Sequence, residues 1–238
     1  EHYHEILRRG QGNIVRWSAA PELPGALELG DELAGKGIKV SMGHSDAGFE
    51  DIVNAMEHGY SQITHFYSAM STITRKRGRR VLGLIECGYL FDRLKVEIIA
   101  DGIHLPPELL KLILKCKNHD DICLVTDSMR GAGMPDGPSL LGSKKNGVPV
   151  IIEDGIANMP DFSSFAGSVA TTDRLVRVMV QKAGLPVWEA VKMASLNPAS
   201  FLGIQETYGS IQPGKSADLL IFDDDIRISS VYVSGIRQ

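Results

Sequence analysis

The chain has 238 residues, of which 43% are hydrophobic and 23% charged, and its formal net charge is −4. A chain of this length and composition can bury one large core, or a large core and a small one. Its negative charge provides no basic field of the kind that nucleic-acid-binding proteins use, apart from one cluster at residues 75–80.

Cysteine content and apolar runs indicate the compartment. The three cysteines, Cys87, Cys116 and Cys123, are odd in number and form no Cys-x-x-Cys pair. This suits a reducing compartment better than a disulfide framework. No apolar run approaches the roughly 18 to 20 residues needed to cross a bilayer. We therefore expect a cytoplasmic protein without a membrane partner.

Short apolar runs alternate with amphipathic stretches after an opening helical segment at residues 1–9. The predicted strands are residues 14–20, 38–42, 62–65, 94–99 and 123–126, and the predicted helices are residues 26–35, 48–58, 106–117, 172–183 and 187–195. This alternation is typical of βα units around a parallel sheet. Five strands do not close an eight-stranded barrel, so we expect about three further strands before Glu1, in a truncated or processed chain.

The pattern changes in two later segments. Residues 137–158 are rich in Gly, Pro and alternating apolar residues, and they predict a β excursion with Asp154-Gly155 at a turn. From residue 209 onward the pattern becomes hairpin-like, which predicts a small β appendage.

Two histidines follow neighbouring predicted strands. His44 lies in Gly43-His44-Ser45 and His65 in Thr64-His65-Phe66. Strand ends of a parallel barrel meet at one edge, so both imidazoles could bind one metal ion, for which zinc and iron are suitable. Two histidines are an incomplete site, since a catalytic metal has about three protein ligands. The alternative is that each is a hydrogen-bonded histidine at a strand end.

Two further polar residues follow later strands. Asp127, after the strand at 123–126, could accept a proton from a water and deliver it to a leaving amine. The alternative is an N-cap, because Asp is favoured there. His104, in Ala100-Asp101-Gly102-Ile103-His104, could contact a substrate or polarise a carbonyl.

Two anion-binding segments are possible. The basic run at residues 75–80 is either a solvated loop or a phosphate contact, because Arg and Lys suit phosphate. RNA binding is the weaker interpretation, since no aromatic platform accompanies the charges. Gly167-Ser168 is expected to precede a helix, where its amides could bind an anion or cap that helix.

Several motifs follow one another along the chain: Ala20-Pro21-Glu22, Gly43-His44-Ser45-Asp46-Ala47, Thr64-His65-Phe66-Tyr67-Ser68-Ala69-Met70, Ile99-Ala100-Asp101-Gly102-Ile103-His104, Leu124-Val125-Thr126-Asp127 and Ala166-Gly167-Ser168. Their order and spacing resemble those of N-acetylglucosamine-6-phosphate deacetylases of the amidohydrolase superfamily. The segment at residues 209–219 is similar to the end of many amidohydrolases.

The resemblance implies an α/β fold with a (β/α)8 TIM-type barrel, whose N-terminal strands are missing here, and a small β appendage. Residues 1–208 would form the C-terminal part of the catalytic barrel and residues 209–238 strands of the small β domain. The implied reaction is metal-dependent hydrolysis of N-acetylglucosamine 6-phosphate to glucosamine 6-phosphate and acetate.

The resemblance also implies residue roles. His44 and His65 would bind a divalent zinc or iron ion, and Asp127 would be the catalytic acid and base. The substrate-binding residues would be Ser68, Ala69, Lys76, His104 and Phe165. A basic residue near the position of Lys76 normally reaches phosphate in this family, often across a dimer interface, so a homodimer is expected.

The sequence departs from the family pattern at three places. The family's metal-binding glutamate belongs upstream of Glu1. Ser68 stands where the family usually has Asn, and Asp161-Phe162-Ser163-Ser164-Phe165 replaces the usual stretch in a loop that covers substrate. The alternatives are therefore an amidohydrolase for another N-acyl substrate, such as N-acetylgalactosamine 6-phosphate, and an inactive truncated fragment.

Overall fold

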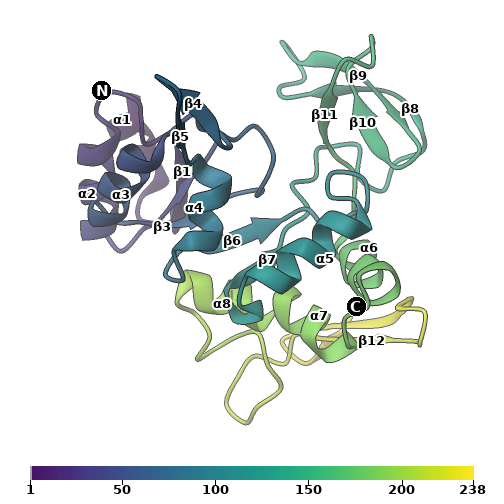
Figure 1. Cartoon of the computed structure of the whole chain (residues 1–238). Helices are drawn as coiled ribbons and strands as arrows, with labels where there is room; N and C mark the ends of the chain where they lie inside the picture. The colour runs from purple at the N-terminus through teal and green to yellow at the C-terminus, as the bar shows by residue number, and fades with distance from the viewer. Residues whose placement is uncertain (1) are drawn as a thin grey trace. The chain divides into compact units, whose positions relative to one another are not determined.

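The computed structural model describes residues 2–238, in two compact units. The first unit comprises residues 2–97 with Ala199–Ile204, and the second comprises Ile98–Pro198 with Gln205–Gln238. All five predicted strands are present, as one sheet of order β1-β2-β3-β6-β7 (Figure 1). Within it, β1 pairs with β2, β2 with β3 and β3 with β6 in parallel.

The first unit alternates strands and helices as predicted. Its strands of the parallel sheet are β1 (Arg16–Ala19), β2 (Lys39–Met42), β3 (Tyr60–Ile63) and most of β6 (Lys95–Ile98). Its helices are α1 (His2–Gly10), α2 (Ala26–Gly35), α3 (Phe49–Glu57) and α4 (Leu84–Leu90). Strands β4 (Thr74–Lys76) and β5 (Arg79–Val81) form an antiparallel hairpin.

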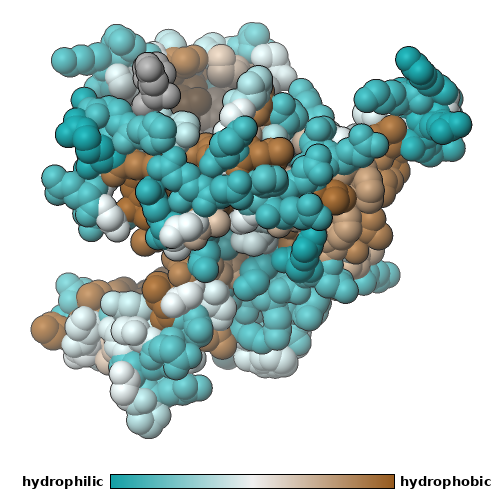
Figure 2. Space-filling view, turned by 90° about the vertical axis from the view of Figure 1, so that its left-hand side faces the viewer, coloured by the Kyte–Doolittle hydropathy of each residue, from teal (hydrophilic) through white to brown (hydrophobic). Residues whose placement is uncertain are grey.

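Apolar packing holds α2 and α3 in this unit. Leu33 of α2, Ile52 of α3 and Val40 of β2 are completely buried. Because apolar residues recur at helical spacing, each helix buries one face and leaves its charged face outside. Figure 2 looks at the side that carries these helices, and hydrophilic residues cover much of it.

A polar network lies across the sheet of the first unit. Arg16 of β1 donates from Nη2 to Glu97 Oε2 of β6 at 2.6 Å. Ser41 Oγ donates to Gln62 Oε1 at 3.2 Å, and Gln62 Nε2 donates to the Phe201 carbonyl at 3.1 Å. Apart from Arg16 Nε, which has no hydrogen-bond partner among the described residues, these polar groups are paired, and this offsets the cost of removing them from water.

The second unit contains more varied elements. Its helices are α5 (Pro107–Cys116), α6 (Thr172–Val178) with a π-helical continuation (Met179–Ala183), and α7 (Val187–Ala194). A 3-10 turn (His119–Asp121) leads into β7 (Ile122–Leu124). Helix α8 (Leu196–Leu202) contributes residues to both units.

The predicted β excursion is a four-stranded antiparallel sheet in the second unit. It consists of β8 (Gly137–Leu141), β9 (Val148–Glu153), β10 (Ile156–Asn158) and β11 (Phe165–Ser168). Asp154 and Gly155 join β9 to β10 with φ angles of 54° and 77°. Positive φ at both central residues is what a tight hairpin turn of this type requires, which confirms the predicted turn.

The C-terminal segment forms a three-stranded antiparallel sheet. Its strands are β12 (Leu219–Phe222), β13 (Ile228–Val233) and β14 (Ile236–Arg237). The strands lie within the segment predicted as a small β domain. The predicted boundary between residues 208 and 209 stays a prediction.

Several local predictions need correction. Helices α4 and α8 were not predicted, and the basic run at residues 75–80 forms the β4–β5 hairpin rather than a loop. Gly167-Ser168 does not directly precede a helix, because both residues lie in β11, paired with β10, and α6 begins at Thr172. None of the described helices is long and apolar enough to cross a membrane.

Candidate active site

The two predicted metal ligands lie next to each other in the first unit. His44 follows β2 and His65 follows β3. Their ring centroids are 4.5 Å apart and their planes differ by 21°. His44 is exposed, whereas His65 is 9% exposed. Neighbouring imidazoles at adjacent strand ends are the arrangement that the sequence predicts for a shared metal ion.

The backbone after His44 is held by contacts from two other segments. Glu22 accepts hydrogen bonds from Ser45 Oγ and from the Asp46 amide, both at 2.7 Å. The Ser45 amide donates to the Ala69 carbonyl at 3.2 Å. Glu22, which follows β1, thus ties the end of one strand to the loop after the next. Its position in Ala20-Pro21-Glu22 marked it as part of a motif, but only these contacts indicate its role.

The loop after β3 carries unusual backbone angles. His65, Tyr67 and Ala69 have φ angles of 29°, 79° and 49°. Positive φ is costly for residues with a side chain, and such residues cluster at functional sites. The Ser68 amide donates to the His65 carbonyl at 2.9 Å, which tightens the loop. The structure therefore brings four of the predicted site residues together: His44, His65, Ser68 and Ala69.

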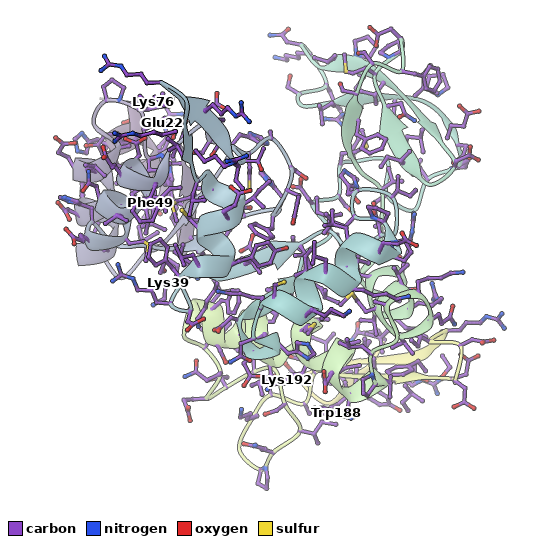
Figure 3. All side chains as sticks on the ribbon, viewed as in Figure 1. Glu22, Lys39, Phe49, Lys76, Trp188 and Lys192 are labelled. Carbon is purple, nitrogen blue, oxygen red and sulfur yellow. The ribbon has the colours of Figure 1, made fainter. Side chains whose placement is uncertain are left out.

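Lys76 lies beside the turn of the β4–β5 hairpin in the same unit (Figure 3). Lys76 pairs with Arg79 and Arg75 with Arg80 across the two strands. All of these side chains are exposed, and the described residues provide none of them with an ion pair. The hairpin thus concentrates positive charge that is unpaired within the described part of the chain, which is suitable for binding an anion.

His104 and Phe165 are brought together in the second unit. Their ring centroids are 5.2 Å apart. His104 Nδ1 lies 2.7 Å from Asp101 Oδ2, and Asp101 Oδ1 accepts hydrogen bonds from the amides of Ile103 and His104. Burial raises the pKa of Asp101, but the hydrogen bonds from His104 and Ile103 outweigh it and lower the pKa below its ordinary value.

Asp127 follows β7 in the second unit and is exposed. Its φ angle is 47°, so it too has the left-handed backbone that is rare outside glycine. The next segment is anchored by the Met129 amide, which donates to the Ser168 carbonyl at 2.9 Å. The N-cap alternative is wrong, because the next described element after Asp127 is the strand β8.

The described residues contain no group of three or more His, Cys, Asp or Glu side chains that could hold a metal ion. The donor set at the strand ends is the pair His44 and His65. Two adjacent imidazoles fit a zinc or iron site in the chemistry of their donors, as two of the three ligands that a catalytic site would have.

A hollow of about 710 Å³ lies elsewhere in the second unit, between α7 and strands β12 and β13. Trp188 and Lys192 of α7 line it (Figure 3), together with apolar residues such as Leu220 and Phe222. None of the predicted site residues lines this hollow. Its largely apolar lining suits packing rather than hydrolytic chemistry.

The sequence model of the amidohydrolase family matches residues 16–237. The chain belongs to the amidohydrolase family. Its fold is part of the α/β, TIM-barrel-like fold of this family. Antiparallel sheets accompany the parallel sheet, as the sequence predicted.

Curated amidohydrolases with similar sequences act on amino-sugar phosphates. The chain is 33% identical to N-acetylgalactosamine-6-phosphate deacetylase of Escherichia coli O157:H7 over 97% of its length and 59% of the relative's. It is also 33% identical to N-acetylglucosamine-6-phosphate deacetylase of Vibrio furnissii, over 99% of its length and 56% of the relative's. The chain thus spans somewhat more than half the length of these relatives.

Solved structures of deacetylases are also similar to this chain. N-acetyl-D-glucosamine-6-phosphate deacetylase from Mycobacterium smegmatis, as a mutant in complex with N-acetyl-D-glucosamine-6-phosphate, superposes with a TM-score of 0.89 at 29% identity. That match covers 99% of this chain and 60% of the other. The enzyme from Pasteurella multocida also has a TM-score of 0.89 and 29% identity. The resemblance to N-acetylglucosamine-6-phosphate deacetylases is confirmed.

Proposed function

We propose that this amidohydrolase hydrolyses N-acetylglucosamine 6-phosphate to glucosamine 6-phosphate and acetate, with the help of a divalent metal ion. The observation that carries the proposal is the pair of adjacent imidazoles, His44 and His65, at the ends of β2 and β3. The similarity to two deacetylases of amino-sugar 6-phosphates supports the choice of reaction.

His44 and His65 would hold a zinc or iron ion. When bound, such an ion polarises a carbonyl and lowers the pKa of a water molecule, so that hydrolysis can proceed at neutral pH. The chain's own contribution is to position the histidines through the backbone around them. Glu22 and the Ala69 carbonyl do this for His44 by holding the residues that follow it.

Asp127 is the proposed acid and base. A carboxylate can take a proton from the attacking water and then protonate the amine that leaves. The exposed side chain and the left-handed backbone of Asp127 support this role over a structural one. Its position three residues after the end of β7 is typical of catalytic residues in barrel enzymes.

The remaining predicted residues would bind the substrate. Lys76, on the basic hairpin, would contact the phosphate, and a homodimer is proposed because this contact often crosses subunits in the family. Ser68 and Ala69 would lie beside the sugar phosphate, and His104 and Phe165 would contact the sugar. A cytoplasmic location is also proposed, since all three cysteines are free thiols.

A second substrate is supported by a specific observation. N-acetylgalactosamine-6-phosphate deacetylase and N-acetylglucosamine-6-phosphate deacetylase are equally similar to this chain, each at 33% identity. A further alternative is a fragment without activity, because the chain spans only 56–59% of these relatives.

The deciding experiment measures acetate release from both sugar phosphates by the full chain, after loading with zinc or with iron. Activity with N-acetylglucosamine 6-phosphate that exceeds activity with its galactose epimer would support the main proposal. The reverse preference would favour the second substrate. No acetate release from either, with metal bound and the protein folded, would contradict both.

A further inference from the structure

Asp101 is a buried carboxylate whose contacts all lie within one short segment. Its side chain is completely buried. Oδ1 accepts from the amides of Ile103 at 2.9 Å and of His104 at 2.8 Å, and Oδ2 lies 2.7 Å from His104 Nδ1. Because both backbone amides bond to Oδ1, Oδ2 is available for the His104 imidazole. Asp101 thus stabilises the turn and also contacts the His104 ring.

This contact determines which ring nitrogen of His104 carries a proton. An ionised carboxylate can only accept hydrogen bonds, so Nδ1 must be the donor. In a neutral imidazole the other nitrogen, Nε2, then has a lone pair and is an acceptor. The lowered pKa of Asp101 keeps its carboxylate ionised at neutral pH.

Nε2 of His104 is accessible to a ligand. Among the described residues it forms no hydrogen bond, and it is not one of the buried polar atoms that lack a partner. Only 9% of the His104 side chain is exposed, so little of the ring reaches solvent. The Phe165 ring, 5.2 Å away, restricts it further.

Arg174 connects the Asp101 segment to a neighbouring turn by two hydrogen bonds. Arg174 donates from Nη2 to the Asp101 carbonyl at 3.1 Å and from Nη1 to the Gly155 carbonyl at 2.8 Å. One guanidinium thus ties the turn after β6 to the turn between β9 and β10. A carboxylate–imidazole pair held in this way keeps one orientation, as positioned hydrogen-bonding groups in binding sites do.

We propose that Asp101 is a positioning residue that holds His104 in the Nδ1–H form, so that Nε2 accepts a hydrogen bond from a hydroxyl group of the sugar. This inference rests on the proposed function, in which His104 contacts the substrate. It assigns the chemistry of that contact: a hydroxyl donor is selected, and a ligand with an acceptor at the same place is disfavoured because two lone pairs would meet.

Nitrogen NMR of the histidine rings tests the tautomer directly. In uniformly ¹⁵N-labelled full-length protein at neutral pH, His104 should give a protonated Nδ1 and an unprotonated Nε2. The signals are assigned by their loss in His104→Ala. Asp101→Asn should weaken this preference, because the amide can also donate to Nδ1. A wild-type His104 with its proton on Nε2 would overturn the inference, whether or not the protein is active.

The protein contains a matched control pair. His58 Nδ1 lies 2.8 Å from Asp31 Oδ2, the same atoms as in the Asp101–His104 pair, but on the surface, with side chains 38% and 59% exposed. Asp31→Asn should leave the His104 ring signals unchanged. It should also leave the kinetics of N-acetylglucosamine 6-phosphate hydrolysis unchanged.

Kinetics test whether Asp101 acts through His104. Asp101→Asn should raise KM for N-acetylglucosamine 6-phosphate about 10-fold while kcat changes little, because the lost bond would serve binding in both ground and transition states. In a His104→Ala background the same change should add nothing. Fully additive effects, or a fall in kcat with unchanged KM, would overturn the proposal. Each variant's thermal midpoint and metal content verify that it is folded.

Failure of the proposed function would look different. A wild-type protein that cleaves neither sugar phosphate would refute that function. The ring spectrum would still decide the inference, because titration with glucosamine 6-phosphate should shift the His104 Nε2 signal. No shift at saturation would contradict the acceptor role.

Discussion

His44 in the first unit and His104 in the second both follow a strand of the parallel sheet, but their rings are held in different ways. The described residues form no hydrogen bond to the His44 ring, whose neighbours are fixed instead by Glu22 and the Ala69 carbonyl. The ring of His104 is itself bound by a buried carboxylate, Asp101. The His44 ring therefore has both nitrogens available, one for a metal ion and one for a further hydrogen-bond partner. The His104 ring is bonded at Nδ1 and has only Nε2 available for a ligand.

The largest effect is expected outside both histidines, at Asp127. Asp127→Asn should lower kcat about 100- to 10,000-fold while metal content is unchanged, because the amide cannot take or return a proton. Acetate release and metal content of the same sample provide the measurement. Asp136→Asn, the same change at another exposed position, is the control. Substantial remaining turnover would refute the assigned role.

The second prediction separates the two histidine types. His44→Ala or His65→Ala should lower metal affinity by roughly 10- to 100-fold or more, since each removes a proposed ligand. His104→Ala and His58→Ala should leave metal affinity unchanged. Competition with a chelator, followed by metal analysis, measures the difference. Equal metal affinity in all four variants would exclude the imidazole pair as a metal site.

The third prediction concerns stability and pH. Because the pKa of Asp101 is lowered on folding, its carboxylate stabilises the protein above the unfolded value of about 4, and this contribution is lost as pH falls through the folded pKa. Asp101→Asn should therefore destabilise the protein by about 1 to 3 kcal/mol at pH 7, and less below pH 4.

Urea unfolding at several pH values measures this difference. Asp31→Asn should change the unfolding free energy by less than about 0.5 kcal/mol at any of them, since Asp31 is 59% exposed. A constant difference between wild type and Asp101→Asn from pH 7 to pH 3 would contradict the assigned ionisation.

The smallest effect is expected at the basic hairpin. Lys76→Ala should raise KM for N-acetylglucosamine 6-phosphate roughly 3- to 10-fold and leave unphosphorylated N-acetylglucosamine unaffected, because an exposed charge contributes modestly. Lys144→Ala, at an exposed position in the second unit, is the control. An equal effect on both sugars would argue against a phosphate contact.

Local sequence patterns were sufficient for most of the fold. The five strands of the parallel sheet and the Asp154-Gly155 turn were predictable because apolar runs and turn residues act over a few positions. The same patterns missed α4, whose seven residues contain Gly88, and assigned the basic residues of the β4–β5 hairpin to a loop. Short segments carry too little periodic signal, and there tertiary contacts decide the conformation.

The sequence by itself determined which residue types follow the strands: His44 and His65 after neighbouring strands, and His104 and Asp127 after later ones. Only the tertiary structure decided how these residues are held. It revealed that Glu22 holds the residues after His44, that the Asp101 carboxylate lies 2.7 Å from His104 Nδ1, and that Gly167-Ser168 lies in a strand. Hydrogen bonds depend on distance in space, and several of these contacts join residues far apart along the chain, where no local pattern records them.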